Sequence, residues 1–156
     1  MNNKKYKVLV LSDHALSTSG VGVQTRHLIN GLLQKGCWSF RQFGAAVKHN
    51  SYETIAVSPD FIIKPIDGFG TPDLIRVTLA AEKPDIVFIF TDPRFFEWLF
   101  AIEDEIHQMC PIVWWHVWDN YPYPDFNNNF YHATDVINCH SHMTYELIKD
   151  KVSTNV

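Results

Sequence analysis

The segment YKVLVLSDHALSTSGVGVQTRHL, residues 6–28, decides the fold class of this chain of 156 residues. Its first part, residues 6–12, is almost continuously apolar, as are strands of parallel sheets that are buried on both faces. A loop with two glycines follows. Residues 22–35 then carry apolar side chains on one helical face, and Gly36 is a natural C-terminal stop. The pattern predicts a strand, a glycine-bearing loop and a helix.

The rest of the chain repeats this alternation of strand and helix. Two further helices are expected to start at the caps Thr71-Pro72 and Asp92-Pro93, and the second of them is expected to reach about Met109. Two more are expected over residues 127–134 and after Ser141. Strands are expected over residues 39–46, 54–58, 61–66, 85–90, 111–118 and 135–140. The alternation predicts an α/β fold, namely a Rossmann-like three-layer α/β/α sandwich with a mostly parallel sheet.

Composition narrows the class of protein. The formal net charge is −4 and there is no long basic run, so nucleic acid is not an expected partner. Cys37, Cys110 and Cys139 form no CxxC pair, and the sequence shows no secretory leader, which favours a reduced, cytoplasmic protein. The aromatic helix around residues 95–106 has an acidic polar face, so membrane association is expected to be absent or weak.

Ligands of open parallel sheets bind beyond the carboxyl ends of the strands. The loop after the first strand contributes Ser19, Gly20, Val21 and Gly22 to that edge. It matches neither the dinucleotide fingerprint, because Thr25 replaces the third glycine, nor the P-loop. Two interpretations remain open: a loop that binds an anion at the start of a helix, or a tight turn that needs a glycine.

The stretch WWHVWDNYPYPDF, residues 114–126, is the second candidate. Aromatic rings with polar tips suit sugar rings, and His116 falls near the end of its strand. Trp114 and Trp115 are expected in the core. The candidates for contact with a ligand are Trp118, Asp119 and Tyr121 after this strand, with Asp13, Asp92 and Arg94 after others.

Several of these residues also have simpler interpretations. Asp92 has the position of a helix N-cap, and Arg94 that of a solvated arginine. His132, His140 and His142 lack the spacing and the acidic or cysteine partners of a metal site, so neither a metal nor another cofactor is expected.

The order of these motifs resembles the N-terminal half of GT-B glycosyltransferases, and most closely the retaining family 4, or group 1. The resemblance rests on the glycine loop, the helix ending LINGLLQKG, the strand ending in His116, and the closing TDVINCHSHMTYELIK, and it covers nearly the whole chain. It departs from the family in two places: Val21 separates the glycines, and Asp119 stands three residues after the histidine.

This resemblance implies a function. Residues 1–156 would form one acceptor-side domain, and the donor-binding domain of the family would be absent from this chain. The partners would be a nucleotide sugar and a hydroxyl-bearing acceptor, with Ser19–Gly22 near the donor phosphates and His116 near the transferred sugar. The acceptor-side candidates are the residues named above. The reaction would retain configuration without a metal, and this half alone would be inactive.

Two other functions compete with this one. The chain would serve as a stand-alone nucleotide- or phosphate-binding Rossmann-like module without catalysis if it bound a nucleotide tightly by itself. A receiver-like interaction domain is disfavoured, because such a domain needs clustered acids at strand ends and only Asp13 and Asp92 qualify.

Overall fold

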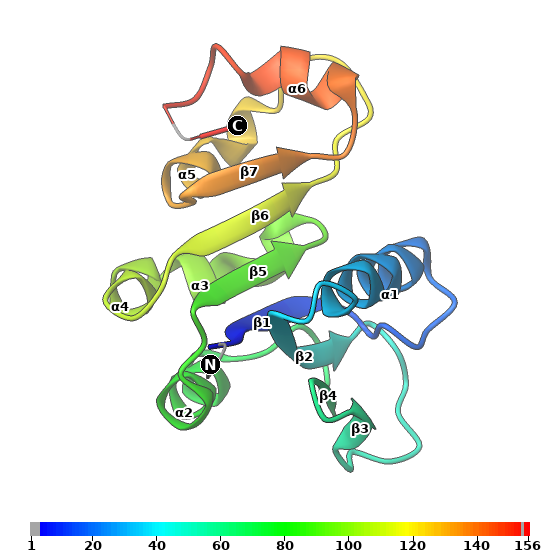
Figure 1. Ribbon diagram of the computed structural model, residues 1–156. Coiled ribbons are helices and arrows are strands. Elements are labelled where there is room, and N and C mark those ends of the chain that lie inside the picture. The colour runs from blue at the N-terminus through cyan, green and yellow to red at the C-terminus, as the bar shows by residue number, and fades with distance from the viewer. Residues whose placement is uncertain (1–3, 154) are drawn as a thin grey trace.

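The computed structural model describes residues 4–153 and 155–156 (Figure 1). It is an α/β structure with a seven-stranded, mostly parallel sheet in the order β3-β4-β2-β1-β5-β6-β7. Only β3 runs antiparallel to its neighbour. The strands are β1 (Tyr6–Asp13), β2 (Trp38–Ala45), β3 (Ile55–Ser58), β4 (Phe61–Pro65), β5 (Ile86–Phe90), β6 (Ile112–His116) and β7 (Val136–Cys139).

Without β3, this order is that of a doubly wound Rossmann-like sheet, in which the chain moves outward from the central strand in both directions. The predicted strands are confirmed, including the short pair around the turn at Ser58, Pro59 and Asp60. The predicted α/β class and mostly parallel sheet are confirmed as well.

The helices begin where their caps predict. Thr71 accepts a hydrogen bond from the N–H of Leu74, and Ser141 accepts one from Thr144. The helices are α1 (Gly20–Leu33), α2 (Pro72–Glu82), α3 (Glu97–Phe100), α4 (Glu103–His107), α5 (Asn128–His132) and α6 (His142–Ile148). No helix in the described ranges has the length and apolar character needed to cross a bilayer.

The single helix predicted from Pro93 to Met109 is wrong. The chain forms a 3-10 turn, η1 (Pro93–Phe96), and then α3 and α4. Its rings pack in several directions: Phe95 stacks on Phe69, whereas Phe100 contacts Phe130. A regular amphipathic helix presents one apolar stripe, so a segment with rings drawn to several neighbours bends between short turns.

Two apolar clusters lie on opposite faces of the sheet. Leu9 and Leu11 of β1 belong to the cluster that includes residues of α2–α6, whereas Val8 and Val10 belong to the cluster that includes Ile29 of α1. Figure 1 shows α1 packed on the β1–β2 side of the sheet. The first face is closed over β5 and β6, where Val87, Ile89, Ile112 and Trp114 are fully buried, whereas on β7 Ile137 is buried and Cys139 only partly so. On the α1 face, the alternate residues Ile86, Val113 and Trp115 are only partly buried. Helix α1 therefore covers the β1–β2 side of its face and leaves the β5–β6 side partly open.

An ion-pair cluster fixes α2 to the sheet at the amino-terminal edge. Glu82 Oε2 accepts from Lys7 Nζ at 2.9 Å and from Arg41 Nε at 3.1 Å. Burial alone would raise the pKa of Glu82, but the two cations outweigh it and the pKa lies below its ordinary value of 4.5. A carboxyl with a lowered folded-state pKa stabilises the fold above its unfolded-state pKa, and this stability is lost as the pH falls through the folded-state pKa.

Replacement of this carboxylate tests the cluster. Glu82→Gln should lower the free energy of unfolding at pH 7 by roughly 0.5–1 kcal/mol, a value kept small because the site is partly exposed. The difference from the unaltered chain should vanish as the pH falls below 4.5 and then through the lower folded-state pKa. Urea unfolding across this range measures it, with the exposed Glu53→Gln as control. A deficit that persists in acid would contradict the assignment.

Candidate functional site

Strands β1 and β5 are neighbours at the centre of the sheet, where the chain reverses its direction of winding. This is the position at which doubly wound sheets open a crevice beyond their carboxyl ends. A pocket of about 420 Å³ lies there, within the size range of small-ligand sites. It is lined by Gly20, Val21, Gln24, Phe90, Trp115, Val117 and His140, and we call it the edge crevice.

A buried polar network sets the path of the loop that leads to this crevice. The amide nitrogen of Gln42 on β2 donates to Ser12 Oγ and to the carbonyl of Asp13, both at 2.8 Å. Its carbonyl oxygen accepts from the N–H of Ala15 at 3.2 Å, and Thr25 of α1 donates to Ser12 Oγ. Buried polar groups are costly without partners, so this set holds β1, β2 and α1 in one arrangement.

The two loop glycines differ in what surrounds them. A Cβ on Gly22 would lie 2.3 Å from Ser17 Oγ and 2.5 Å from the carbonyl oxygen of His14, so only glycine fits without movement. A Cβ on Gly20 would meet nothing within 4 Å. Gly22 is thus required by the tight turn, whereas packing within the described chain does not require Gly20, which lines the edge crevice.

The side chain of Ser19 caps α1 and brings a carboxylate to its start. Ser19 Oγ accepts from the N–H of Gly22 at 2.9 Å and donates to Asp13 Oδ2 at 2.7 Å. The first N–H groups of any helix lack intrahelical acceptors and attract negative charge. The carboxylate of Asp13, which accepts from Ser19 Oγ, supplies part of that negative charge.

Two rings form the wall opposite the loop. Phe90 at the end of β5 and Trp115 of β6 are stacked, with ring centroids 4.3 Å apart and an interplanar angle of 18°. The prediction that both tryptophans lie in the core is confirmed for Trp114, which is fully buried. It is confirmed only in part for Trp115, which packs against the α1-side cluster but is partly exposed and lines the edge crevice. Trp115 is partly exposed because α1 does not fully cover β6, and no local sequence pattern predicts this incomplete cover.

His116 lies on the other face of β6 and is 1% exposed. Its Nε2 is 2.8 Å from the hydroxyl of Tyr131, its ring packs on Trp114, and its buried Nδ1 has no hydrogen-bond partner within the described residues. Burial first, and then His140, lower the pKa of His116 to about 4, although Asp92 acts in the opposite direction. His116 is therefore neutral at pH 7, and it is not among the residues that line the edge crevice.

The other predicted residues gather elsewhere on the carboxyl edge. Asp92 caps η1 through the N–H of Arg94, as its simpler interpretation expects. The Arg94 guanidinium lies 5.9 Å from the ring of Phe126, and the Trp118 ring contacts that phenyl edge-on. Asp119 and Tyr121 are exposed on the loop after β6. The structure thus brings Asp13, at the end of β1, to the glycine loop through Ser19, and Arg94 and Trp118 to the ring of Phe126, whereas Asp119 and Tyr121 are exposed on their loop.

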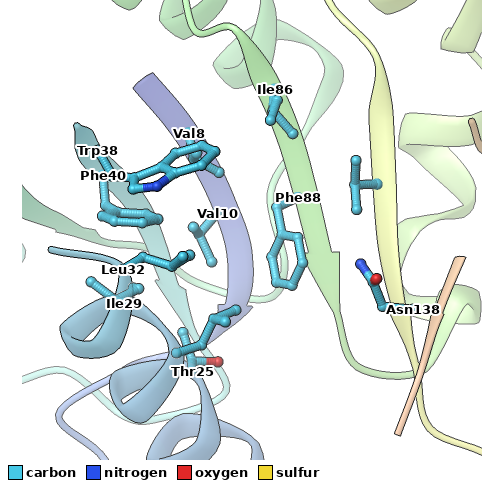
Figure 2. A pocket seen from close by; sticks show the side chains of 12 residues that line it. Val8, Val10, Thr25, Ile29, Leu32, Trp38, Phe40, Ile86, Phe88 and Asn138 are labelled. Carbon is cyan, nitrogen blue, oxygen red and sulfur yellow. The ribbon is translucent and has the colours of Figure 1, made fainter. Parts of the chain in front are cut away.

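A second pocket, of about 200 Å³, lies between α1 and the sheet (Figure 2). Figure 2 shows Ile29 and Leu32 of α1 beside Val10 and Phe40, with Phe88 of β5 across from them. Only Thr25 and Asn138 among its lining residues are polar. This pocket is a packing gap beside the core and offers little to orient a polar ligand.

Neither a protein-family model nor a curated protein matches the sequence. In the described ranges no three His, Cys, Asp or Glu side chains gather as a metal site requires.

The two glycines provide a matched pair of variants. Gly22→Ala should lower the free energy of unfolding by about 1–3 kcal/mol, because its Cβ would overlap Ser17 and the backbone of His14. Gly20→Ala should leave the stability unchanged or raise it by up to about 1 kcal/mol, since alanine is the better helix former and meets open space. Urea unfolding of both variants decides this. Equal destabilisation would show that Gly20 also serves the fold.

Proposed function

We propose that this chain is the acceptor-side half of a retaining GT-B glycosyltransferase, which transfers a sugar from a nucleotide sugar to a hydroxyl acceptor. The observation that carries the proposal is the edge crevice. On one side of it lies Gly20, at the first turn of the 14-residue helix α1, and on the other lie the stacked rings of Phe90 and Trp115. A phosphate suits the first and the apolar face of a sugar ring suits the second. A nucleotide sugar carries both groups side by side.

Each part of the crevice has a role in this proposal. The N–H groups at Gly20 and Val21 would face the diphosphate, where negative charge develops as the sugar leaves. Trp115 would stack on the sugar, and His140 would meet its hydroxyls. The described residues that line the crevice include no Asp or Glu, so a carboxylate base for the acceptor hydroxyl would come from the ligand or a second domain. His116 would act as a neutral group that positions its neighbours.

The surroundings of the crevice agree with a docking second domain. Apolar side chains on the carboxyl edge are widely exposed, from 42% for Val117 to 65% for Tyr121. The others of this group are Leu16, Phe95 and Phe126. Such a patch marks an interaction surface when it is contiguous. In the proposal, the sheet with α1 on one face and α2–α6 on the other is a three-layer Rossmann-like domain that faces its partner here.

The proposal also includes a cytoplasmic location. Cys37, Cys110 and Cys139 are free thiols, as a reducing compartment requires.

The alternative is a nucleotide- or phosphate-binding module without catalysis. The open helix start at Gly20 favours it equally, because this feature needs only an anion. The aromatic wall separates sugar transfer from the binding of a bare phosphate, which has no use for Trp115. A nucleotide could stack its base on the same ring, so the strength of nucleotide binding separates a nucleotide module from a sugar-transfer half.

Titration of the ¹⁵N-labelled chain tests the proposal. Methyl glycosides of common hexoses and a panel of nucleotide sugars should shift the Trp115 indole N–H and the Gly20 and Val21 amides. Dissociation constants should be in the millimolar range, as expected of half a site, and nucleoside diphosphates alone should bind no more tightly than about 1 mM. Micromolar binding of nucleotides without sugar would establish the alternative. Absence of any response would refute both.

Two tryptophan variants serve as the matched controls. Trp115→Leu should weaken saccharide binding at least about fivefold, because it removes the stacking face. Trp38→Leu alters a partly buried tryptophan of the same apolar cluster at the start of β2, away from the carboxyl edge, and should leave binding unchanged. Equal losses in the two variants would indicate a general loss of packing and would count against the assigned site.

A further inference from the structure

A second polar pocket opens at the carboxyl edge, on the β2–β4 side of the glycine loop. Its volume is about 340 Å³. Its polar lining consists of His14, Ser17, Lys48, His49, Asn50 and Ser51, with four apolar residues around them. Each of these six side chains carries a hydrogen-bond donor, and the described residues that line the pocket include no Asp or Glu. We call it the His14 pocket.

The backbone fixes the proton on the His14 ring. The N–H of Leu16 donates to His14 Nδ1 at 3.1 Å, so the neutral ring carries its proton on Nε2. The side chain is 6% exposed, and burial first, with His49 second, lowers the pKa of His14. His14 therefore presents a neutral, oriented Nε2–H donor at pH 7. No hydrogen bond of the described residues occupies that donor.

A glycine in the sheet makes room for this ring. A Cβ on Gly44 of β2 would lie 2.5 Å from His14 Cδ2 and 2.8 Å from Ile63 Cγ2. Glycine inside a strand weakens the strand and marks a close approach. Glycine at position 44 therefore weakens β2 but leaves the space that the His14 imidazole occupies.

The second histidine is also held in place. His49 Nε2 lies 3.0 Å from the carbonyl oxygen of Ile66, which can only accept, so Nε2 carries a proton. Its ring centroid is 5.7 Å from that of His14 and 5.4 Å from that of Tyr52. The nearby acid Asp67 accepts from the Tyr52 hydroxyl at 2.6 Å and is not a lining residue.

We propose that the His14 pocket binds an oxyanion, a phosphate or carboxylate group carried by a small ligand, through His14 Nε2–H and the Lys48 ammonium. The open Nε2–H of His14 and the Lys48 ammonium, in a lining whose described residues include no Asp or Glu, suit a group that only accepts hydrogen bonds. Ser17 lines this pocket and also contacts Ser19 Oγ at 3.0 Å, so the site adjoins the glycine loop. The proposal does not depend on sugar transfer.

Three probes test it by NMR titration at pH 7.5 and constant ionic strength: glucose 6-phosphate, glucuronate and uncharged methyl glucoside. At least one of the two anions should shift the amides of residues 14–17 and 48–51 with a dissociation constant below about 10 mM. The uncharged glucoside should bind this pocket at least about tenfold more weakly. The stronger of the two anions identifies the group.

Lys48→Gln should weaken anion binding about tenfold, because Lys48 is exposed and its loss removes a charged donor without disturbing the core. Lys35→Gln, an exposed lysine after α1, should change nothing. Gly20→Ala should also leave anion binding to the His14 pocket intact, because Gly20 lines the edge crevice and not this pocket. This variant therefore separates binding at the two sites. The proposal is overturned if neither anion binds, if methyl glucoside binds as well as they do, or if Lys35→Gln weakens binding as much as Lys48→Gln.

Discussion

The close approach of α1 to the end of β1 is the constraint on which the rest of this structure depends. Gly22 permits it, because any Cβ at that position would overlap Ser17 Oγ and the carbonyl oxygen of His14. The Gln42 network then fixes the same junction from below through Ser12 and Thr25. With the helix start held there, Gly20 comes to line the edge crevice and His14 the pocket beside it. One tight turn thereby positions both candidate sites.

Much of the fold could be predicted from the sequence because its signals are local. Apolar runs specify strands, and Thr71, Ser141 and Asp92 specify starts through their own side-chain hydrogen bonds. The broken helix after Pro93 could not be predicted, because its cause is the placement of Phe69 and Phe130 in space. The partial cover over β5 and β6 depends likewise on a tertiary feature, the packing of α1 against β1 and β2.

The candidate site was predictable at its glycine loop and less so at its walls. A strand end locates a residue at the correct edge of a sheet, yet the period of two decides the face on which its side chain lies. His116 and Trp115 are adjacent, and so they lie on opposite faces of β6. The crevice receives the tryptophan, whereas the histidine packs against Trp114 and Tyr131. The residue chosen for its chemistry is therefore buried, and the one assigned to the core lines the edge crevice.

The central claim is that a sugar stacks on Trp115 while its phosphate meets the first turn of α1. Intermolecular nuclear Overhauser effects in a complex of this chain with a nucleotide sugar test it most directly. The account predicts contacts between the ring protons of the sugar and the indole protons of Trp115. Contacts confined to Trp118 and Phe126, or a sugar that shows none while the loop amides respond, would contradict it.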